Sequence, residues 1–83
     1  MRVTVQLFAR LREAAGVGEC DCDVRPGAVV ADVWRALSSR YPALEPFAGS
    51  VTCAINAEFA KPAAEVREGD EVAFLPPVSG GAR

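Results

Sequence analysis

Histidine, long apolar runs and an excess of one charge are all absent from this sequence. Without histidine, the chain lacks the commonest acid–base catalyst and metal ligand of proteins. Nine lysines and arginines stand against eleven aspartates and glutamates, so no basic surface for nucleic acid is indicated. No apolar run approaches the roughly 20 residues that cross a bilayer, and the first residues do not resemble a signal peptide. We therefore expect a cytoplasmic protein that binds neither nucleic acid nor a membrane.

Cysteine is also scarce, with three residues at positions 20, 22 and 53. An odd number of cysteines provides no disulfide framework, and a Cys-x-Cys spacing lacks the separation and the further ligands of a zinc site. Cys20 and Cys22 alternate with Asp21 and Asp23, which turns both thiols toward one face of a strand. We expect no metal site, and thiols that pack as small apolar side chains in a reducing compartment.

The 83 residues suffice for one small domain, and a hydrophobic fraction of 51% indicates a globular chain. Alternation of apolar residues predicts strands, over residues 2–8, 19–25, 51–56 and 72–75 and in a short return segment from Phe59. Helical spacing predicts a short helix over residues 9–15 and a main amphipathic helix over residues 30–41. Residues 46–49 and 65–71 are expected to form loops. The pattern predicts an α+β domain in which a mixed sheet packs on one main helix.

Three large apolar residues occupy solvent-facing positions of the predicted strands, namely Phe8, Phe59 and Leu75. If the terminal strands are neighbours, the three side chains form one patch, and contiguous apolar patches mark partner sites. Pro76-Pro77 would then project the chain stiffly away from the sheet. Gly80-Gly81 forms a tip slender enough to enter a channel that any side chain would block.

The segment from Gly69 to Gly81 reads Gly-Asp-Glu-Val-Ala-Phe-Leu-Pro-Pro-Val-Ser-Gly-Gly, and it closely resembles the end of molybdopterin synthase small subunits. Residues 7–13 (Leu-Phe-Ala-Arg-Leu-Arg-Glu) and 54–56 (Ala-Ile-Asn) are similar to two further parts of the same family. Its members are ubiquitin-like sulfur carriers with the β-grasp fold. The resemblance implies a β-grasp domain over residues 1–77 and a flexible tail over residues 78–83 that carries the two glycines.

The resemblance also implies a sulfur-donor subunit of a transferase, active only with its large subunit, more than a self-sufficient enzyme. An ATP-using, ubiquitin-activating-like enzyme would adenylate the Gly81 carboxylate, and a persulfide donor would convert the adenylate into a thiocarboxylate. Gly80 supplies reach, and the thiocarboxylate would donate sulfur to a pterin precursor inside the large subunit, in a heterotetramer. The domain itself would bind no cofactor. The docking surface implied for these partners comprises Phe8, Phe59, Leu75, Pro76, Pro77 and Val78.

The sequence departs from the family pattern because it continues past Gly81 with Ala82-Arg83. Since a carbonyl held in a peptide bond cannot be adenylated, three accounts stay open: proteolytic maturation, truncation of a longer fusion, and lost chemistry. The intact glycines favour the first two. Two other functions also stay open. One is a sulfur carrier for tRNA thiolation, cysteine or thiamine biosynthesis, and the other is a ubiquitin-like modifier that forms isopeptide bonds with lysines.

Overall fold

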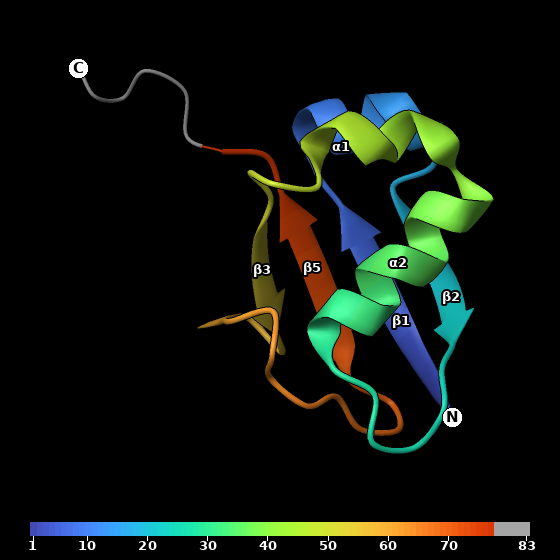
Figure 1. Cartoon of the computed structure of the whole chain (residues 1–83), viewed down its shortest axis with the longest axis vertical. Coiled ribbons are helices and arrows are strands. Elements are labelled where there is room, and N and C mark those ends of the chain that lie inside the picture. The colour runs from blue at the N-terminus through green and yellow to red at the C-terminus, as the bar shows by residue number, and fades with distance from the viewer. Residues whose placement is uncertain (78–83) are drawn as a thin grey trace.

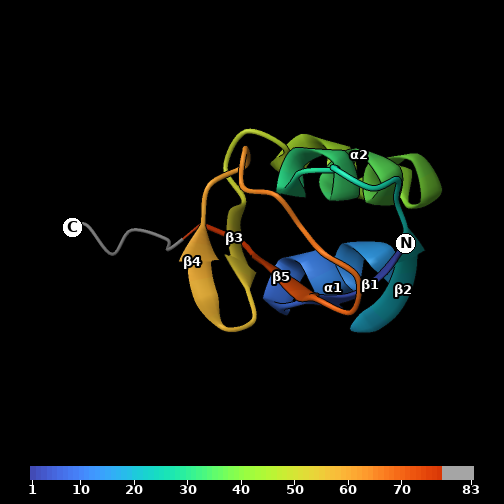
Figure 2. The same ribbon diagram turned by 90° about the horizontal axis from the view of Figure 1, so that it is seen from below.

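A computed structural model describes residues 1–77 of the chain. Five strands form one sheet in the order β2-β1-β5-β3-β4, and the long helix α2 packs on one face of it (Figure 1, Figure 2). In chain order the elements are β1 (Arg2–Leu7), α1 (Ala9–Ala15), β2 (Glu19–Asp23), α2 (Val30–Arg40), the 3-10 helix η1 (Pro42–Phe47), β3 (Thr52–Ile55), β4 (Glu58–Ala60) and β5 (Glu71–Leu75). This is the α+β arrangement that the sequence predicts.

The first and last strands lie side by side in the sheet. β1 runs parallel to β5, with Val5 opposite Val72, whereas the other neighbouring strands pair antiparallel. α1 and η1 contact each other and cover the end of the sheet at which β1 and β5 finish (Figure 1). The sequence predicts a single apolar patch only if the terminal strands are neighbours, and the structure shows that they are.

Alternation along β1 builds the core beneath α2. Val3, Val5 and Leu7 point toward the helix and are at most 2% exposed. The facing side of α2 carries apolar residues that recur at helical spacing and are fully buried, Val30, Val33 and Leu37. Burial of this apolar surface is the main force that holds the helix on the sheet.

A carboxylate anchors the start of α2. The N-cap residue is Val29, whose side chain cannot cap, and Asp32 Oδ2 accepts a hydrogen bond of 2.9 Å from the Val29 backbone N–H. This bond, with a smaller contribution from the Arg35 guanidinium, holds the pKa of the Asp32 carboxyl below its usual value. The side chain of Asp32 thus takes the place of a capping residue, and its negative charge in the first turn also suits the helix dipole.

The connection after α2 is more regular than the sequence predicts. α2 ends at Arg40, one residue before its predicted end, and Pro42 then begins η1, which runs to Phe47. The prediction of a loop from Pro46 is therefore wrong for its first two residues. Proline fits the first position of a helix because its missing N–H would have no partner there.

Smaller differences concern where elements end and what a loop buries. β2 ends at Asp23 and β3 at Ile55, each a little earlier than predicted. Asn56 and Ala57 form the turn into β4 with positive φ angles of 50° and 72°. In the segment predicted to be a solvated loop, Val66 is only 1% exposed and belongs to the core. A single valine in a charged run carries no periodicity, so its burial was not visible in the sequence.

The chain leaves the sheet after β5, at the end that α1 and η1 cover (Figure 1). Pro76 and Pro77 are the last described residues, and the expected tail over residues 78–83 lies outside them. The expected boundary at residue 77 therefore stays a prediction. Among residues 1–77 the longest helix is α2, with 11 residues, and no helix there is long and apolar enough to cross a bilayer.

Candidate functional site

The face of the sheet opposite α2 carries a row of apolar side chains. In this row Ala54 of β3 lies opposite Phe59 of β4 on one side and opposite Ala73 of β5 on the other. Phe74, the residue after Ala73, is fully buried, so alternation turns the row away from the core. We call the apolar residues of this surface the docking face: Phe8, Phe59, Ala73 and Leu75, together with Ala54, which lies between Phe59 and Ala73 and is only 7% exposed.

Phe8 joins the docking face through an extension of the parallel pair. Its backbone N–H donates a hydrogen bond of 3.3 Å to the Phe74 carbonyl oxygen, which continues the register of Leu7 with Phe74 and sets Phe8 beside Leu75. Phe8 is extended, and Ala9 then takes a φ of 51° that turns the chain into α1. Phe8 is thus the residue before α1 and not the end of a strand as predicted. As predicted, it is exposed, at 41%.

The predicted patch residues share one face but do not all touch. Phe8 and Leu75 are neighbours, whereas Phe59 lies two strands away from Leu75. The space between them is bridged by Ala54 and Ala73, which sequence reasoning did not name as site residues. The signal was present, since the alternation of residues 51–56 places Ala54 on the solvent side.

Polar and charged groups surround the docking face. Gln6 donates a side-chain hydrogen bond of 2.6 Å to Glu71, and Asn56 donates one of 3.0 Å to Asp70. On the same side of the sheet, toward β2, Arg2 pairs with Asp23 at 3.4 Å. An apolar centre inside a polar rim is the usual composition of a protein–protein interface.

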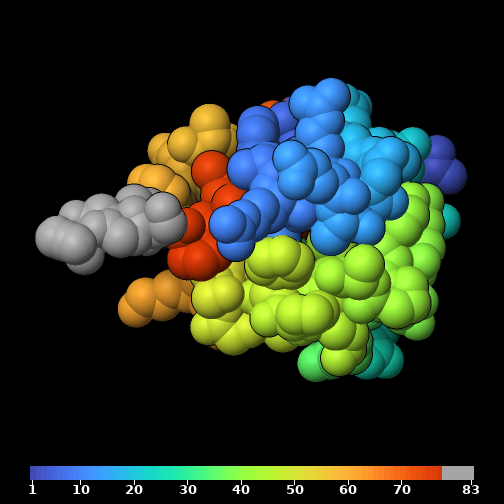
Figure 3. All heavy atoms as spheres, turned by 90° about the horizontal axis from the view of Figure 1, so that it is seen from above, coloured from blue at the N-terminus to red at the C-terminus, as the bar shows by residue number. Residues whose placement is uncertain are grey.

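The docking face continues directly into the segment that leads to the tail. Leu75 ends β5, and Pro76 and Pro77 follow it without an intervening residue. Figure 3 shows the end of β5 and the residues after it (red) at the surface beside α1 (blue) and the η1 region (yellow-green). A hollow of about 460 Å³ lies at this point, lined by Arg10, Phe47 and Pro77 among others. The remaining predicted site residues, Val78, Gly80 and Gly81, lie outside the described residues.

The cysteines occupy the positions that alternation predicts. Cys22 and Cys53 are buried and Cys20 is half-buried. Burial raises the pKa of all three thiols, which keeps them protonated and poorly nucleophilic at neutral pH. Within residues 1–77 no cluster of three side chains of the metal-binding types forms. The described part of the chain thus offers a surface for docking, and its three thiols are held in the poorly nucleophilic form.

Known proteins are similar to this chain in sequence and in fold. The chain is 36% identical, over 83 residues, to the molybdopterin synthase sulfur carrier subunit of Chlamydomonas reinhardtii, covering 98% of this chain and 100% of that one. It matches the crystal structure of SAMP1 from Haloferax volcanii with a TM-score of 0.87 and 35% identity, covering 98% and 100% of the two chains. It also matches a chain in the crystal structure of the Amycolatopsis orientalis BexX/CysO complex, with a TM-score of 0.70, 28% identity and coverage of 95% and 99%.

These similarities confirm the predicted β-grasp fold. They extend over nearly the whole chain, and the model of the ThiS family matches residues 5–81, which include both glycines of the tail. The chain therefore belongs to the ThiS family.

Proposed function

We propose that this chain is the sulfur-carrier subunit of molybdopterin synthase, which donates sulfur from a Gly81 thiocarboxylate to a pterin precursor during molybdenum cofactor biosynthesis. The observation that carries the proposal is the continuity of the docking face with the root of the tail, where Leu75 leads directly into Pro76-Pro77. A partner that covers this face also receives the chain that leads to Gly81. The curated relative with 36% identity bears the name of this subunit.

Activation begins at the Gly81 carboxylate. A carboxylate has no good leaving group, so ATP is consumed by an adenylating partner to form an acyl-adenylate and pyrophosphate. The terminal sulfur of a persulfide then attacks the acyl carbon and displaces AMP, and a second thiol cleaves the resulting S–S bond to leave the thiocarboxylate. This domain contributes the carried group and its docking, and the reacting side chains belong to the partners. The free thiols of the chain suit the reducing cytoplasm.

A partner subunit is expected at the docking face. The similar chain from Amycolatopsis orientalis was crystallised in the BexX/CysO complex. In this chain the exposed ring of Phe59 and the polar rim provide the anchor and the border of such an interface. We expect the large subunit of molybdopterin synthase, in a heterotetramer, and the adenylating enzyme to use this face in turn. The domain itself is expected to hold no cofactor.

A second candidate function is protein modification. The chain superposes on SAMP1, a small archaeal modifier protein, with a TM-score of 0.87. In this function the activated Gly81 would be attacked by a lysine amine instead of sulfur, and the same tail would form an isopeptide bond. The two functions share the adenylation step and differ in the nucleophile that follows it.

The test offers the chain ending at Gly81 to the adenylating enzyme with ATP and a persulfide donor. Intact mass reports exchange of one oxygen for sulfur. The charged protein is then mixed with the large subunit and the pterin precursor, and release of the sulfur is followed. Thiocarboxylate formation and its consumption only with the large subunit support the proposal. If the protein instead forms lysine conjugates in cell extract and transfers no sulfur to the precursor, the modifier function is favoured over the sulfur-carrier function.

A further inference from the structure

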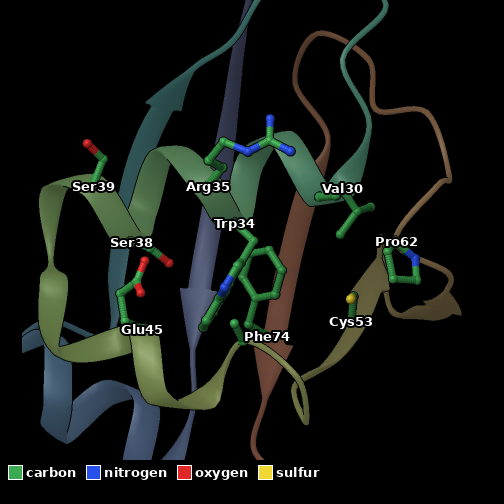
Figure 4. A pocket seen from close by; sticks show the side chains of 11 residues that line it. Val30, Trp34, Arg35, Ser38, Ser39, Glu45, Cys53, Pro62 and Phe74 are labelled. Atoms are coloured by element: carbon green, nitrogen blue, oxygen red, sulfur yellow. The ribbon is translucent and has the colours of Figure 1, made fainter.

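A cavity of about 460 Å³ lies on the other side of the sheet from the docking face, between α2, η1 and β3 (Figure 4). Its apolar lining includes Trp34, Phe74 and Cys53, with the rings of Trp34 and Phe74 in an edge-on contact of 5.0 Å between centroids. A volume in this range suits a small molecule. Nothing in the proposed sulfur chemistry uses this cavity.

Two polar atoms at the cavity are buried without a hydrogen-bond partner among residues 1–77. They are Trp34 Nε1, which can only donate, and Ser38 Oγ, whose residue is 8% exposed. A buried donor without an acceptor is costly and uncommon in a native protein. Two such atoms, in residues that lie one helical turn apart and line the same cavity, point to a ligand that supplies an acceptor.

The third polar group of the cavity is an acceptor. Glu45 of η1 lines the cavity, and Figure 4 shows its carboxylate directed toward Ser38. Arg35 is engaged elsewhere, since its Nη1 lies 2.9 Å from Asp32 Oδ1 and its side chain extends from α2 away from Trp34 (Figure 4). The residues that line the cavity therefore carry two shielded donors and one exposed carboxylate.

We propose that this cavity binds a small, neutral, planar aromatic lactam, with the ring against Trp34. The lactam oxygen accepts from Trp34 Nε1–H and Ser38 Oγ–H, and the adjacent lactam N–H donates to the Glu45 carboxylate. An anionic ligand is disfavoured because it would face the negative charge of Glu45. Both donors are shielded from solvent in the structure, so the ligand reaches them only when side chains at the mouth of the cavity shift.

The chain provides its own reporter, because Trp34 is its one tryptophan and its indole N–H yields one NMR signal. The probe is oxindole, which has both the lactam oxygen and the lactam N–H. Two comparison compounds each lack one of these groups: N-methyloxindole has the lactam oxygen but no N–H, and indole has an N–H but no lactam oxygen. We expect oxindole to shift the Trp34 indole signal saturably, with a dissociation constant on the order of 1 mM for a ligand of this size. N-methyloxindole and indole should each bind at least about fivefold more weakly.

Two variants assign the contacts, and a third is the matched control. Ser38→Ala should lower the affinities for oxindole and for N-methyloxindole by a similar factor. Glu45→Ala should lower the affinity for oxindole to that for N-methyloxindole, and it should leave the affinity for N-methyloxindole unchanged. Ser39→Ala, which removes the neighbouring exposed hydroxyl, should leave all three affinities at wild-type values. The proposal is overturned if oxindole leaves the Trp34 signal unmoved, if indole binds as tightly as oxindole, or if Ser38→Ala and Glu45→Ala have no effect.

Discussion

Phe59 of β4 lies directly opposite Ala54 of β3, and beyond Ala54 the same row continues with Ala73 of β5. The small side chains of this row cannot cover the aromatic ring, which is 83% exposed. A large apolar ring held over alanines on a sheet, with polar groups at the border, is the geometry of an interface anchor. This relationship makes the docking face a binding surface instead of an incomplete core.

Phe59→Ala is expected to weaken binding to the large subunit and to the adenylating enzyme by about tenfold or more, since a central aromatic anchor contributes a large share of an interface. Isothermal titration with each partner measures the loss. The unfolding midpoint should stay close to that of the wild type, because the ring is exposed. Phe74→Ala is the contrasting variant and should cost about 3–5 kcal/mol of stability. If Phe59→Ala binds both partners with wild-type affinity, the partners do not bind at the docking face.

Ala57→Gly is expected to stabilise the hairpin that carries Phe59. Asn56 and Ala57 both have positive φ angles, a pair that two-residue hairpins prefer to fill with Asn-Gly. Glycine relieves the backbone strain at position 57, but it also gives the unfolded chain more conformational freedom, which lowers stability. The net effect should be a gain in stability of about 0.5–1 kcal/mol. Urea unfolding measures the change. A loss of stability would show that Ala57 does not adopt this turn in solution.

Cys22→Ser is expected to lower stability by about 1–3 kcal/mol, because a hydroxyl in place of this buried thiol costs free energy when it has no hydrogen-bond partner. Cys20→Ser, at a half-buried position of the same strand, should cost less. Both proteins, ending at Gly81, should still accept sulfur. A folded Cys22→Ser protein that accepts none would show that the thiol takes part in the chemistry.

Asp32→Ala is expected to destabilise the protein in a manner that depends on pH. The hydrogen bond from Val29 lowers the pKa of the Asp32 carboxyl in the folded state. The stabilisation is therefore present above the unfolded pKa of about 3.9 and is lost as the pH falls through the lower, folded value. Thermal melts at a series of pH values should show a gap between wild type and variant at pH 7 that narrows below about pH 4. A gap that is constant over this range would contradict the assigned hydrogen bond.

Much of the fold follows from local pattern, and most of the site does not. Alternation identified β1 and the inward cysteines because each strand has one buried face. It could not show that Ala54 bridges Phe59 and Ala73, since that depends on which strands pair and in what register. The unpartnered Ser38 hydroxyl was likewise invisible, because a serine on a helix is ordinary until the helix packs. The tail could be predicted from its residue types alone, namely the two prolines followed by the two glycines.

The measurement that tests the central claim most directly is the intact mass of two purified forms after incubation with the adenylating enzyme, ATP and a persulfide donor. One form ends at Gly81 and the other continues with Ala82-Arg83. We expect exchange of one oxygen for sulfur in the first form alone, because the Gly81 carbonyl of the second is held in a peptide bond. Equal thiocarboxylate formation on the longer form, or none on a folded Gly81 form that binds the adenylating enzyme, would contradict the account of Gly81 as the carrier of sulfur.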